Sequence, residues 1–249
     1  YNGILALGES LILGRLYVKP DDLWICPSEF NVEYSKERFP GMKNEKVIYG
    51  VEPFPECADE SAVKLASGYR EKHDPLILSL GHVTGCRDRV DLIRAMAVLR
   101  KKHPRAGLII IGDQQVTYPA REAEKLGLKD TVHFLGKIPR EKIKPFVVNS
   151  DIEAHWYLDA SMFGVATLES MATGICCMSS SSEDCYGKDL FKEGKHYWKV
   201  EAGNIGKIAD DISRLANDRP LRERIAAQGR EFVKENLSWD RIGNMLISV

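Results

Sequence analysis

The amino-acid sequence predicts an α/β protein whose mostly parallel sheet is covered by helices on both faces. Short apolar runs bounded by turn residues alternate with segments of helical periodicity along most of the chain. Parallel strands need crossover connections, which are usually helical and right-handed. The alternation therefore indicates βαβ units and a layered α/β fold.

Composition narrows the class of protein further. The chain has 249 residues, of which 44% are hydrophobic and 29% charged, as is common in soluble globular proteins. Its 35 Lys and Arg nearly balance its 36 Asp and Glu. Net charge therefore gives no argument for binding nucleic acid or an anionic membrane, and any anion site must be local.

Cysteine usage and hydropathy predict a cytoplasmic protein. The six cysteines show no C-x-x-C spacing, and the adjacent Cys176 and Cys177 lie in an apolar run, which favours buried thiols in a reducing compartment. No apolar stretch is long enough to span a bilayer, and the first residues carry no basic leader.

The first fifty residues are expected to form a partial lobe, separate from the rest. Strands are predicted at 23–28 and 46–50, with a helix at 31–39 between them. Residues 50–61 contain prolines and four acids without apolar periodicity, and we place the boundary there. The predicted domains are residues 1–50 and 51–249.

The second domain repeats strand and helix in order. Strands are predicted at 76–81, 107–113, 132–137, 151–157 and 175–179. Helices are predicted at 89–103, 119–128, 140–150, the segment after Gly164, 204–218 and 220–239. Pro145 is expected to kink its helix, and Asp218 to cap the last one. In such a sheet, ligands bind beyond the carboxyl ends of the strands, so the residues that follow each strand are the candidates.

Two of these loops suit a phosphate. The loop GHVTGCRDR (81–89) combines glycines with arginines; on its own it is best explained as an ordinary loop with solvent-exposed arginines. The stretch SMFGVATLE (161–169) places Phe163 and Gly164 at a helix start, where free amides and the helix dipole, worth ~0.3–2 kcal/mol, favour an anion.

Glu169 is an acid at the margin of a buried helix face. At about 100° per residue, Val165, Leu168 and Ala172 form the expected buried stripe, and Glu169 lies at its edge. A carboxylate there needs donors. The sugar hydroxyls of a nucleotide or an Arg or Lys of the protein would serve equally well. Neither G-x-G-x-x-G nor a Walker loop is present.

Taken together, these residues resemble the C-terminal half of the retaining glycosyltransferases of family 4, which have the GT-B fold. The matching stretches occur in the family's order: KVIYGVEPF, LSLGHVTGCRDRVDLIRA, LIIIGDQQ, VHFLGKIP, NSDIEAHWY, FGVATLESMATG, LFKEGKHYW and LSWDRI. The resemblance implies a Rossmann-like donor-binding domain, a nucleotide-diphosphate sugar as substrate, no metal and no cofactor. It also implies a separate N-terminal domain or split-subunit partner on the acceptor side, so this chain would supply mainly the donor-binding half.

The resemblance also implies roles for individual residues. His82 and Arg87 stand where the family grips the diphosphate, Ser161 where a glutamate contacts the donor sugar, and Glu169 where a second glutamate holds the ribose. Asp159, two residues before Ser161, is the candidate substitute for the missing glutamate. The implied donor-binding residues are Gly81, Gly136, Lys137, Ile138, Phe163, Gly164, Val165 and Glu169.

Departures from the family leave other functions open. Ser161 is a weaker acceptor than a carboxylate, His82 is not a permanent cation, and SSSSEDCYG (179–187) replaces a glycine-rich loop. One alternative is a catalytically degenerate nucleotide-binding or interaction module that serves an active partner. Another is a sugar-nucleotide epimerase, for which His155 is the only candidate base at a strand end; a core or cleft-wall histidine is the simpler interpretation.

The acceptor is expected to be a carbohydrate or a lipid. The lysines of REKIKPF (140–146) are most simply a solvated helix face, although a lipid acceptor would allow a peripheral position at the membrane.

Overall fold

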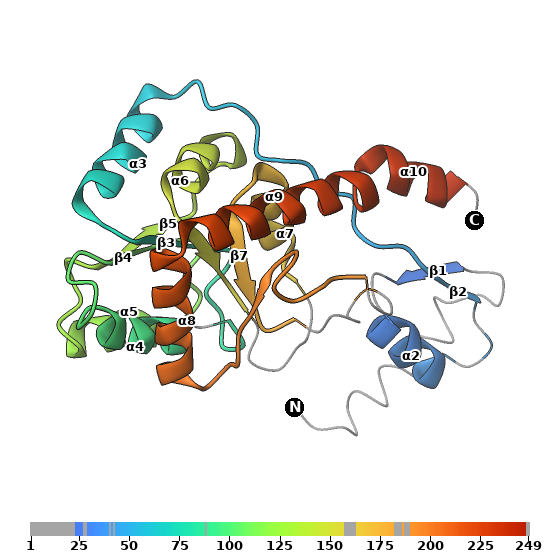
Figure 1. Ribbon diagram of the computed structural model, residues 1–249. Coiled ribbons are helices and arrows are strands. Elements are labelled where there is room, and N and C mark those ends of the chain that lie inside the picture. Colours follow the sequence, from blue (N-terminus) through green and yellow to red (C-terminus); the bar gives the residue numbers. More distant parts are fainter. Residues whose placement is uncertain are drawn as a thin grey trace.

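The computed structural model describes residues 23–26, 29–39, 41, 43–87, 89–156, 163–181, 186 and 190–247, with the backbone alone at residues 29 and 30. A parallel sheet of six strands in the order β5-β4-β3-β6-β7-β8 forms its centre (Figure 1). The strands are β3 (Leu76–Leu80), β4 (Gly107–Ile111), β5 (Val132–Gly136), β6 (Ile152–Ala154), β7 (Cys176–Ser179) and β8 (Trp198–Lys199). The predicted α/β class with a parallel sheet is confirmed.

Helices cover both faces of this sheet, as the sequence predicts (Figure 1). On one face, apolar side chains of α4 (Val90–Leu99), α5 (Tyr118–Lys125) and α8 (Ile205–Asn217) pack in a core with Ile77 and Leu108 of the sheet. On the other face, α3 (Glu60–Lys72), α6 (Lys144–Asn149), α7 (Val165–Thr173) and α9 (Arg219–Asn236) pack around Leu78 and Cys177. The central strands β3 and β4 are buried along their whole length, as parallel strands with two covered faces must be.

Strand order creates a switch point beside β3. The chain runs from β3 outward through β4 and β5, and then returns to the other side of β3 to form β6 and β7. The connections therefore leave the sheet in opposite directions at the carboxyl ends of β3 and β6. This is where a crevice forms in open α/β sheets and where their ligands bind.

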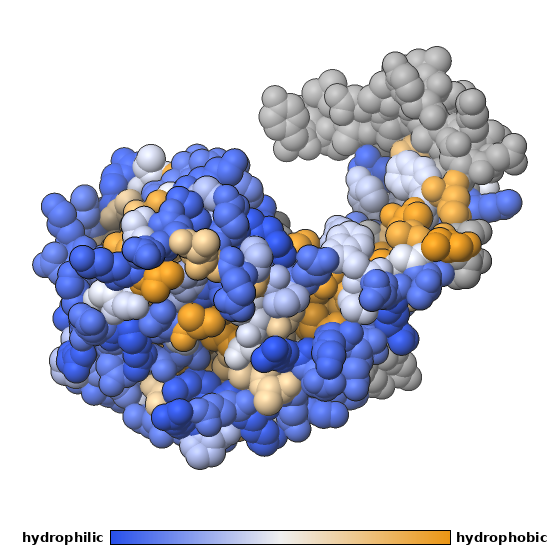
Figure 2. All heavy atoms as spheres, turned by 90° about the horizontal axis from the view of Figure 1, so that it is seen from above, coloured by the Kyte–Doolittle hydropathy of each residue, from blue (hydrophilic) through white to orange (hydrophobic). Residues whose placement is uncertain are grey.

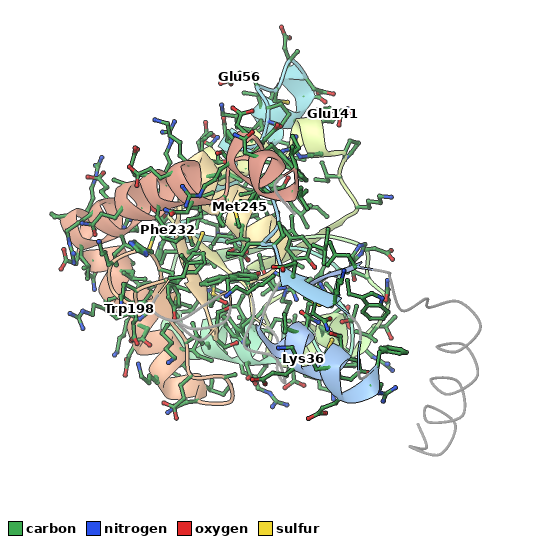
Figure 3. The ribbon with its side chains drawn as sticks, turned by 90° about the vertical axis from the view of Figure 1, so that its right-hand side faces the viewer. Lys36, Glu56, Glu141, Trp198, Phe232 and Met245 are labelled. Atoms are coloured by element: carbon green, nitrogen blue, oxygen red, sulfur yellow. The ribbon has the colours of Figure 1, made fainter. Side chains whose placement is uncertain are left out.

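A smaller unit lies beside the main sheet. It contains β1 (Leu23–Cys26), α2 (Glu29–Arg38) and β2 (Lys43–Lys46), and its two strands pair in parallel with each other. Helix α10 (Trp239–Ile247) reaches this end of the molecule (Figure 1). Figure 3 looks at this end, with Lys36 of α2 in the lower part and Met245 of α10 in the upper part. The predicted boundary at residue 50 remains a prediction.

Apolar side chains gather on the surface at this end (Figure 2). Leu23 and Ile25 of β1 are 39% and 50% exposed, and Ile247 of α10 is 87% exposed. The connection to the main body is tight, because a Cβ on Gly50 would lie 2.5 Å from the Trp239 ring, and the Val51 amide donates to the Leu237 carbonyl at 2.8 Å.

Several predicted elements need correction. The strand expected at 46–50 lies at Lys43–Lys46, where Asn44 and Lys46 can pair with β1. Pro145 does not kink a helix: it occupies the first turn of α6, after a separate 3-10 turn η1 (Arg140–Lys142), because a missing N–H is tolerated at a helix start. The helix expected over 220–239 ends at Asn236, and α10 follows as a separate helix.

Candidate functional site

The glycine–arginine loop follows β3 at the switch point. Gly81 has φ = 115°, which a side chain would strain, and its amide donates to the Ile111 carbonyl at 2.9 Å. Val83 continues the pairing with a 2.9 Å bond to the Asp113 carbonyl. The loop is therefore held against the end of β4, and its position is fixed by backbone hydrogen bonds.

The charged residues of this loop are arranged differently from the expectation. His82 is exposed, and Arg87 is half-buried with its amide bonded to the Thr84 carbonyl at 3.1 Å. Arg89 is 5% exposed, whereas the loop's arginines, considered alone, were expected to be solvent-exposed. Local composition could not reveal this, because the Arg89 guanidinium is buried where the chain folds back on Ser79 and Leu80 of the preceding strand β3 and on carbonyls of its own loop.

Arg89 holds the loop in place through hydrogen bonds of its side chain. It adopts a left-handed conformation with φ = 68°, uncommon for a residue other than glycine. Its guanidinium donates to Ser79 Oγ at 2.8 Å, to the Gly81 carbonyl at 3.1 Å and to the Arg87 carbonyl at 2.5 Å. These bonds stabilise the strained backbone and hold a positive charge beneath Gly81.

Helix α7 begins beside this loop, at Gly164. Among the described residues, no side chain caps the helix at this end. Phe163 is 2% exposed and packs on Phe191 at 4.5 Å, while the Tyr186 hydroxyl donates to the Phe163 carbonyl at 2.8 Å. The aromatic anchor fixes where the helix starts. Backbone amides at an uncapped helix start can bind an anion.

Val165 corrects one expectation about the buried stripe of α7. It is 44% exposed, whereas Leu168 and Ala172 are buried as expected. The buried face is centred on Thr167, Leu168 and Met171, because α9 packs on the helix from that side. Val165 therefore lies at the open edge of the helix start.

Glu169 contacts a protein cation. Arg140 Nε donates to Glu169 Oε1 at 2.8 Å, and the two side chains are 45% and 18% exposed. Arg140 also lies over the Phe54 ring, 5.7 Å from its centroid. Of the two explanations that the sequence left open, the structure shows the protein arginine. One bond does not saturate a carboxylate, which offers about four acceptor sites.

Two buried polar side chains lie near the Gly81 loop and the start of α7: Glu153 on β6 and His155 just after it. Glu153 is fully buried, and burial raises the pKa of its carboxyl to about 8, against the opposing effects of the Leu80 amide, the Arg89 charge and the Thr167 hydroxyl. His155 is 3% exposed, and burial, reinforced by Arg89 and Arg87, lowers the pKa of its ring well below the usual value. His155 is thus neutral at neutral pH.

The implied donor-binding residues Gly136, Lys137 and Ile138 lie at the end of β5 and just after it. Gly136 has φ = 68° and its carbonyl accepts from the Gly112 amide at 2.9 Å, which places this turn next to the glycine–arginine loop. Lys137 is exposed and Ile138 is half-buried against the core. The structure therefore brings Gly81, Gly136 and Gly164 to one edge of the sheet, as the strand order predicts.

Some expected site residues cannot be placed. Asp159 and Ser161 lie outside the described residues, as does most of the segment 179–187. Within the described part of the chain, no three His, Cys, Asp or Glu side chains are grouped as a metal site. The same part contains no helix that is both long and apolar enough to cross a bilayer.

The cations of residues 140–146 are paired with protein acids. Lys142 Nζ lies 2.5 Å from Asp59 Oδ2, and Lys144 pairs with Glu56. Figure 3 shows Glu56 and Glu141 at the same outer edge of the molecule. Because acids accompany these lysines, the segment does not present a purely basic surface, in agreement with a solvated helix face.

Comparisons with known proteins agree with this geometry. The sequence pattern of the family described as Glycosyl transferases group 1 matches residues 65–232. The fold is that of a Rossmann-like α/β domain of the GT-B class, and the structural neighbours are GT-B glycosyltransferases. The chain belongs to the family Glycosyl transferases group 1.

Individual relatives are distant. A GDP-mannose-dependent alpha-(1-6)-phosphatidylinositol monomannoside mannosyltransferase of Mycobacterium tuberculosis is 23% identical over 87% of this chain and 59% of its own length. Spore coat protein SA of Bacillus subtilis is 22% identical over 70% of this chain and 48% of its own length. The chain thus spans about half to three-fifths of the length of these curated relatives.

Solved structures show the same fold. Anabaena Alr3699/HepE, in complex with UDP and glucose, superimposes with a TM-score of 0.82 at 17% identity, covering 99% of this chain and 67% of the other. The C-terminal domain of the group 1 protein LpcC from Francisella tularensis gives a TM-score of 0.59 at 19% identity, covering 75% of this chain and 96% of that domain.

Proposed function

We propose that this chain is the donor-binding part of a retaining glycosyltransferase that moves a sugar from a nucleotide-diphosphate sugar to an acceptor hydroxyl. The observation that carries the proposal is the meeting of the Gly81 loop and the uncapped start of α7 at the switch point, with Glu169 about one turn further along. Structural neighbours in complex with UDP, and relatives named as GDP-mannose-dependent enzymes, support a nucleotide donor.

The diphosphate would bind between the two loops. Amides of residues 164–166 donate to its oxygens, and Arg87 adds a cation from the opposite side. As the bond to the sugar breaks, negative charge grows on the diphosphate. Fixed donors and a helix dipole stabilise that charge without reorganising, and this electrostatic effect is strongest in a closed, dry cleft.

The ribose would bind at Glu169. Arg140 occupies one acceptor position of this carboxylate and fixes its orientation, and the remaining positions can accept the two ribose hydroxyls. Gly136, Lys137 and Ile138 would lie along the base. One neighbour was solved with UDP and several relatives are named as GDP-mannose-dependent, so the binding experiments use both a uracil and a guanine nucleotide.

We propose that Ser161, or Asp159 in its place, contacts the donor sugar, and that His82 approaches the diphosphate. We also propose that no metal takes part and that a second α/β lobe or subunit binds a carbohydrate or lipid acceptor, the latter at a membrane surface. The names of several relatives specify a phosphatidylinositol acceptor.

Binding of nucleoside diphosphates tests the ribose site. We expect Glu169→Ala to weaken UDP or GDP binding by roughly tenfold, equivalent to ~1.4 kcal/mol, while the thermal midpoint stays unchanged. Glu169 is partly exposed, so its loss leaves the core intact. Arg140→Ala should weaken UDP or GDP binding less, because the Glu169 carboxylate remains to accept hydrogen bonds. Equal affinity of the Glu169 variant and the wild type, measured by calorimetry, contradicts the ribose role.

Turnover separates an enzyme from a degenerate module. We expect transfer or slow hydrolysis of a nucleotide sugar, unaffected by EDTA, when the acceptor-side lobe is present. If the wild type binds the nucleotide but is inactive, and Ser161→Glu restores turnover, the chain is a degenerate module.

A further inference from the structure

Two glycines of the site are packed against one histidine ring. A Cβ on Gly81 would lie 3.1 Å from Cε1 of His155, and a Cβ on Gly164 would lie 3.0 Å from the same atom. Gly81 directly follows β3 and Gly164 directly precedes α7, so the ring separates the two segments that form the proposed diphosphate site. A Cβ at these distances would be tighter than ordinary van der Waals contact, so a side chain at either glycine would have to displace the ring.

The position of the ring is itself fixed. The His155 amide donates to the Met178 carbonyl at 3.1 Å, which continues the β6–β7 pairing to the site edge. On the ring, Nδ1 lies 3.4 Å from Oγ1 of Thr167, which is in the first turn of α7. Thr167 and His155 are both buried, so solvent does not compete for this contact.

We propose that His155 is a positioning residue: its ring sets the spacing between the Gly81 loop and the start of α7, and hence the width of the slot that receives the donor diphosphate. The proposal rests on the proposed nucleotide site. His155 acts through the two backbone segments, and Thr167 orients it. Because burial keeps the ring neutral, it contributes shape rather than charge.

A role in shape makes a specific prediction about substitutions. Phenylalanine has a ring of similar size and should keep the spacing, whereas alanine leaves a cavity into which the two loops can move. A shift of about 1 Å in a group that binds a ligand can lower function roughly 100-fold. The nucleoside part of the ligand binds elsewhere, at Glu169 and Gly136, and should be unaffected.

Hydrogen exchange of the ligand-free protein is the first test. In His155→Ala, the amides of residues 81–85 and of residues 163–167 should both exchange faster than in the wild type, and in His155→Phe neither should. His103→Ala is the matched control, because His103 bonds to Ser213 at the opposite end of the sheet. Unchanged exchange in a folded His155→Ala protein overturns the inference, whether or not the chain binds nucleotides.

Ligand binding is the second test. His155→Ala should weaken UDP or GDP at least tenfold and the matching nucleoside less than twofold, while His155→Phe stays within threefold for both. Equal losses for nucleoside and diphosphate overturn the inference. A wild-type protein that binds neither nucleotide refutes the proposed function, and the exchange result then still decides the role of His155. If the alanine variant does not fold, His155→Gln takes its place: it should loosen both segments and lose diphosphate affinity, and failure to do so overturns the inference.

Discussion

Arg87 and Arg89 are two residues apart and do different things. Arg89 is buried, and its guanidinium donates to the backbone of the loop. Arg87 is half-buried at the surface of the same loop, near enough to His155 for its charge to affect that ring. Arg89 therefore holds the loop through hydrogen bonds, and Arg87 is the arginine that we propose for the diphosphate. Removing the two side chains should have different consequences, and only the loss of Arg87 should weaken diphosphate binding more than nucleoside binding.

For Arg87→Ala, we expect binding of UDP or GDP to weaken by roughly tenfold, since a charge-assisted hydrogen bond contributes ~1.5–3 kcal/mol. Nucleoside binding should change little. Calorimetric titration with both ligands measures the difference. Arg94→Ala is a suitable control, because Arg94 lies on the next helix and pairs with Glu122 at 2.7 Å. Equal losses for diphosphate and nucleoside would argue against a phosphate contact.

At the scale of the elements, helix ends determine where the chain turns. Asp218 was expected to cap the last long helix, and its Oδ1 accepts from the Leu221 amide at 3.0 Å, with Pro220 in the first turn of α9. Helix α9 packs on α7 and on β7, so the cap also fixes the helix that supports the proposed site. Helix α7, by contrast, begins at Gly164 with no side-chain cap among the described residues.

Asp218→Ala should lower the free energy of unfolding by ~1 kcal/mol, the usual cost of losing an N-cap. Urea unfolding measures it. Asp210→Ala offers a matched control: Asp210 pairs with Lys102, but both side chains are more than 60% exposed, so we expect a loss of ~0.5 kcal/mol or less. The cap hypothesis fails if the two variants are equally stable.

At the scale of the whole molecule, a pair of histidines connects the end of α3 with strand β5. His73 follows α3 and His133 lies on β5; their Nε2 atoms are 2.8 Å apart. Burial and, to a smaller extent, the neighbouring His73 lower the pKa of His133 to about 4; burial likewise lowers the pKa of His73. The folded protein therefore keeps the pair neutral, while the unfolded chain takes up protons near pH 6.5.

Stability should consequently fall as the pH decreases from about 6.5 to about 4, because the unfolded state then binds more protons than the folded state. His133 is only half-buried, so solvent screening limits its contribution to ~1–2 kcal/mol. Urea unfolding at pH 7, 5.5 and 4.5 measures the loss. His133→Phe should be less sensitive over this range, and an identical pH dependence would rule out the pair as its cause.

The sequence alone determined the layered fold and the edge at which the site lies. Apolar runs of strand length, separated by helical segments, dictate a parallel sheet, and parallel strands bring all their carboxyl ends to one edge. Gly81, Gly136 and Gly164 could be assigned to that edge because each follows or precedes a recognisable element. Helix α3 and the short strand β8 had no clear periodic signal and were missed.

Only the tertiary structure decided which side chains meet there. Arg140 and Glu169 are 29 residues apart and lie on different elements. Arg89 is buried because it folds back on Ser79 of β3 and on its own loop. Val165 is exposed because α9 covers the other face of α7. His155 lies between two glycines that are 83 residues apart. Periodicity reports burial along one element, whereas these contacts depend on how separate elements pack, and local sequence does not contain that information.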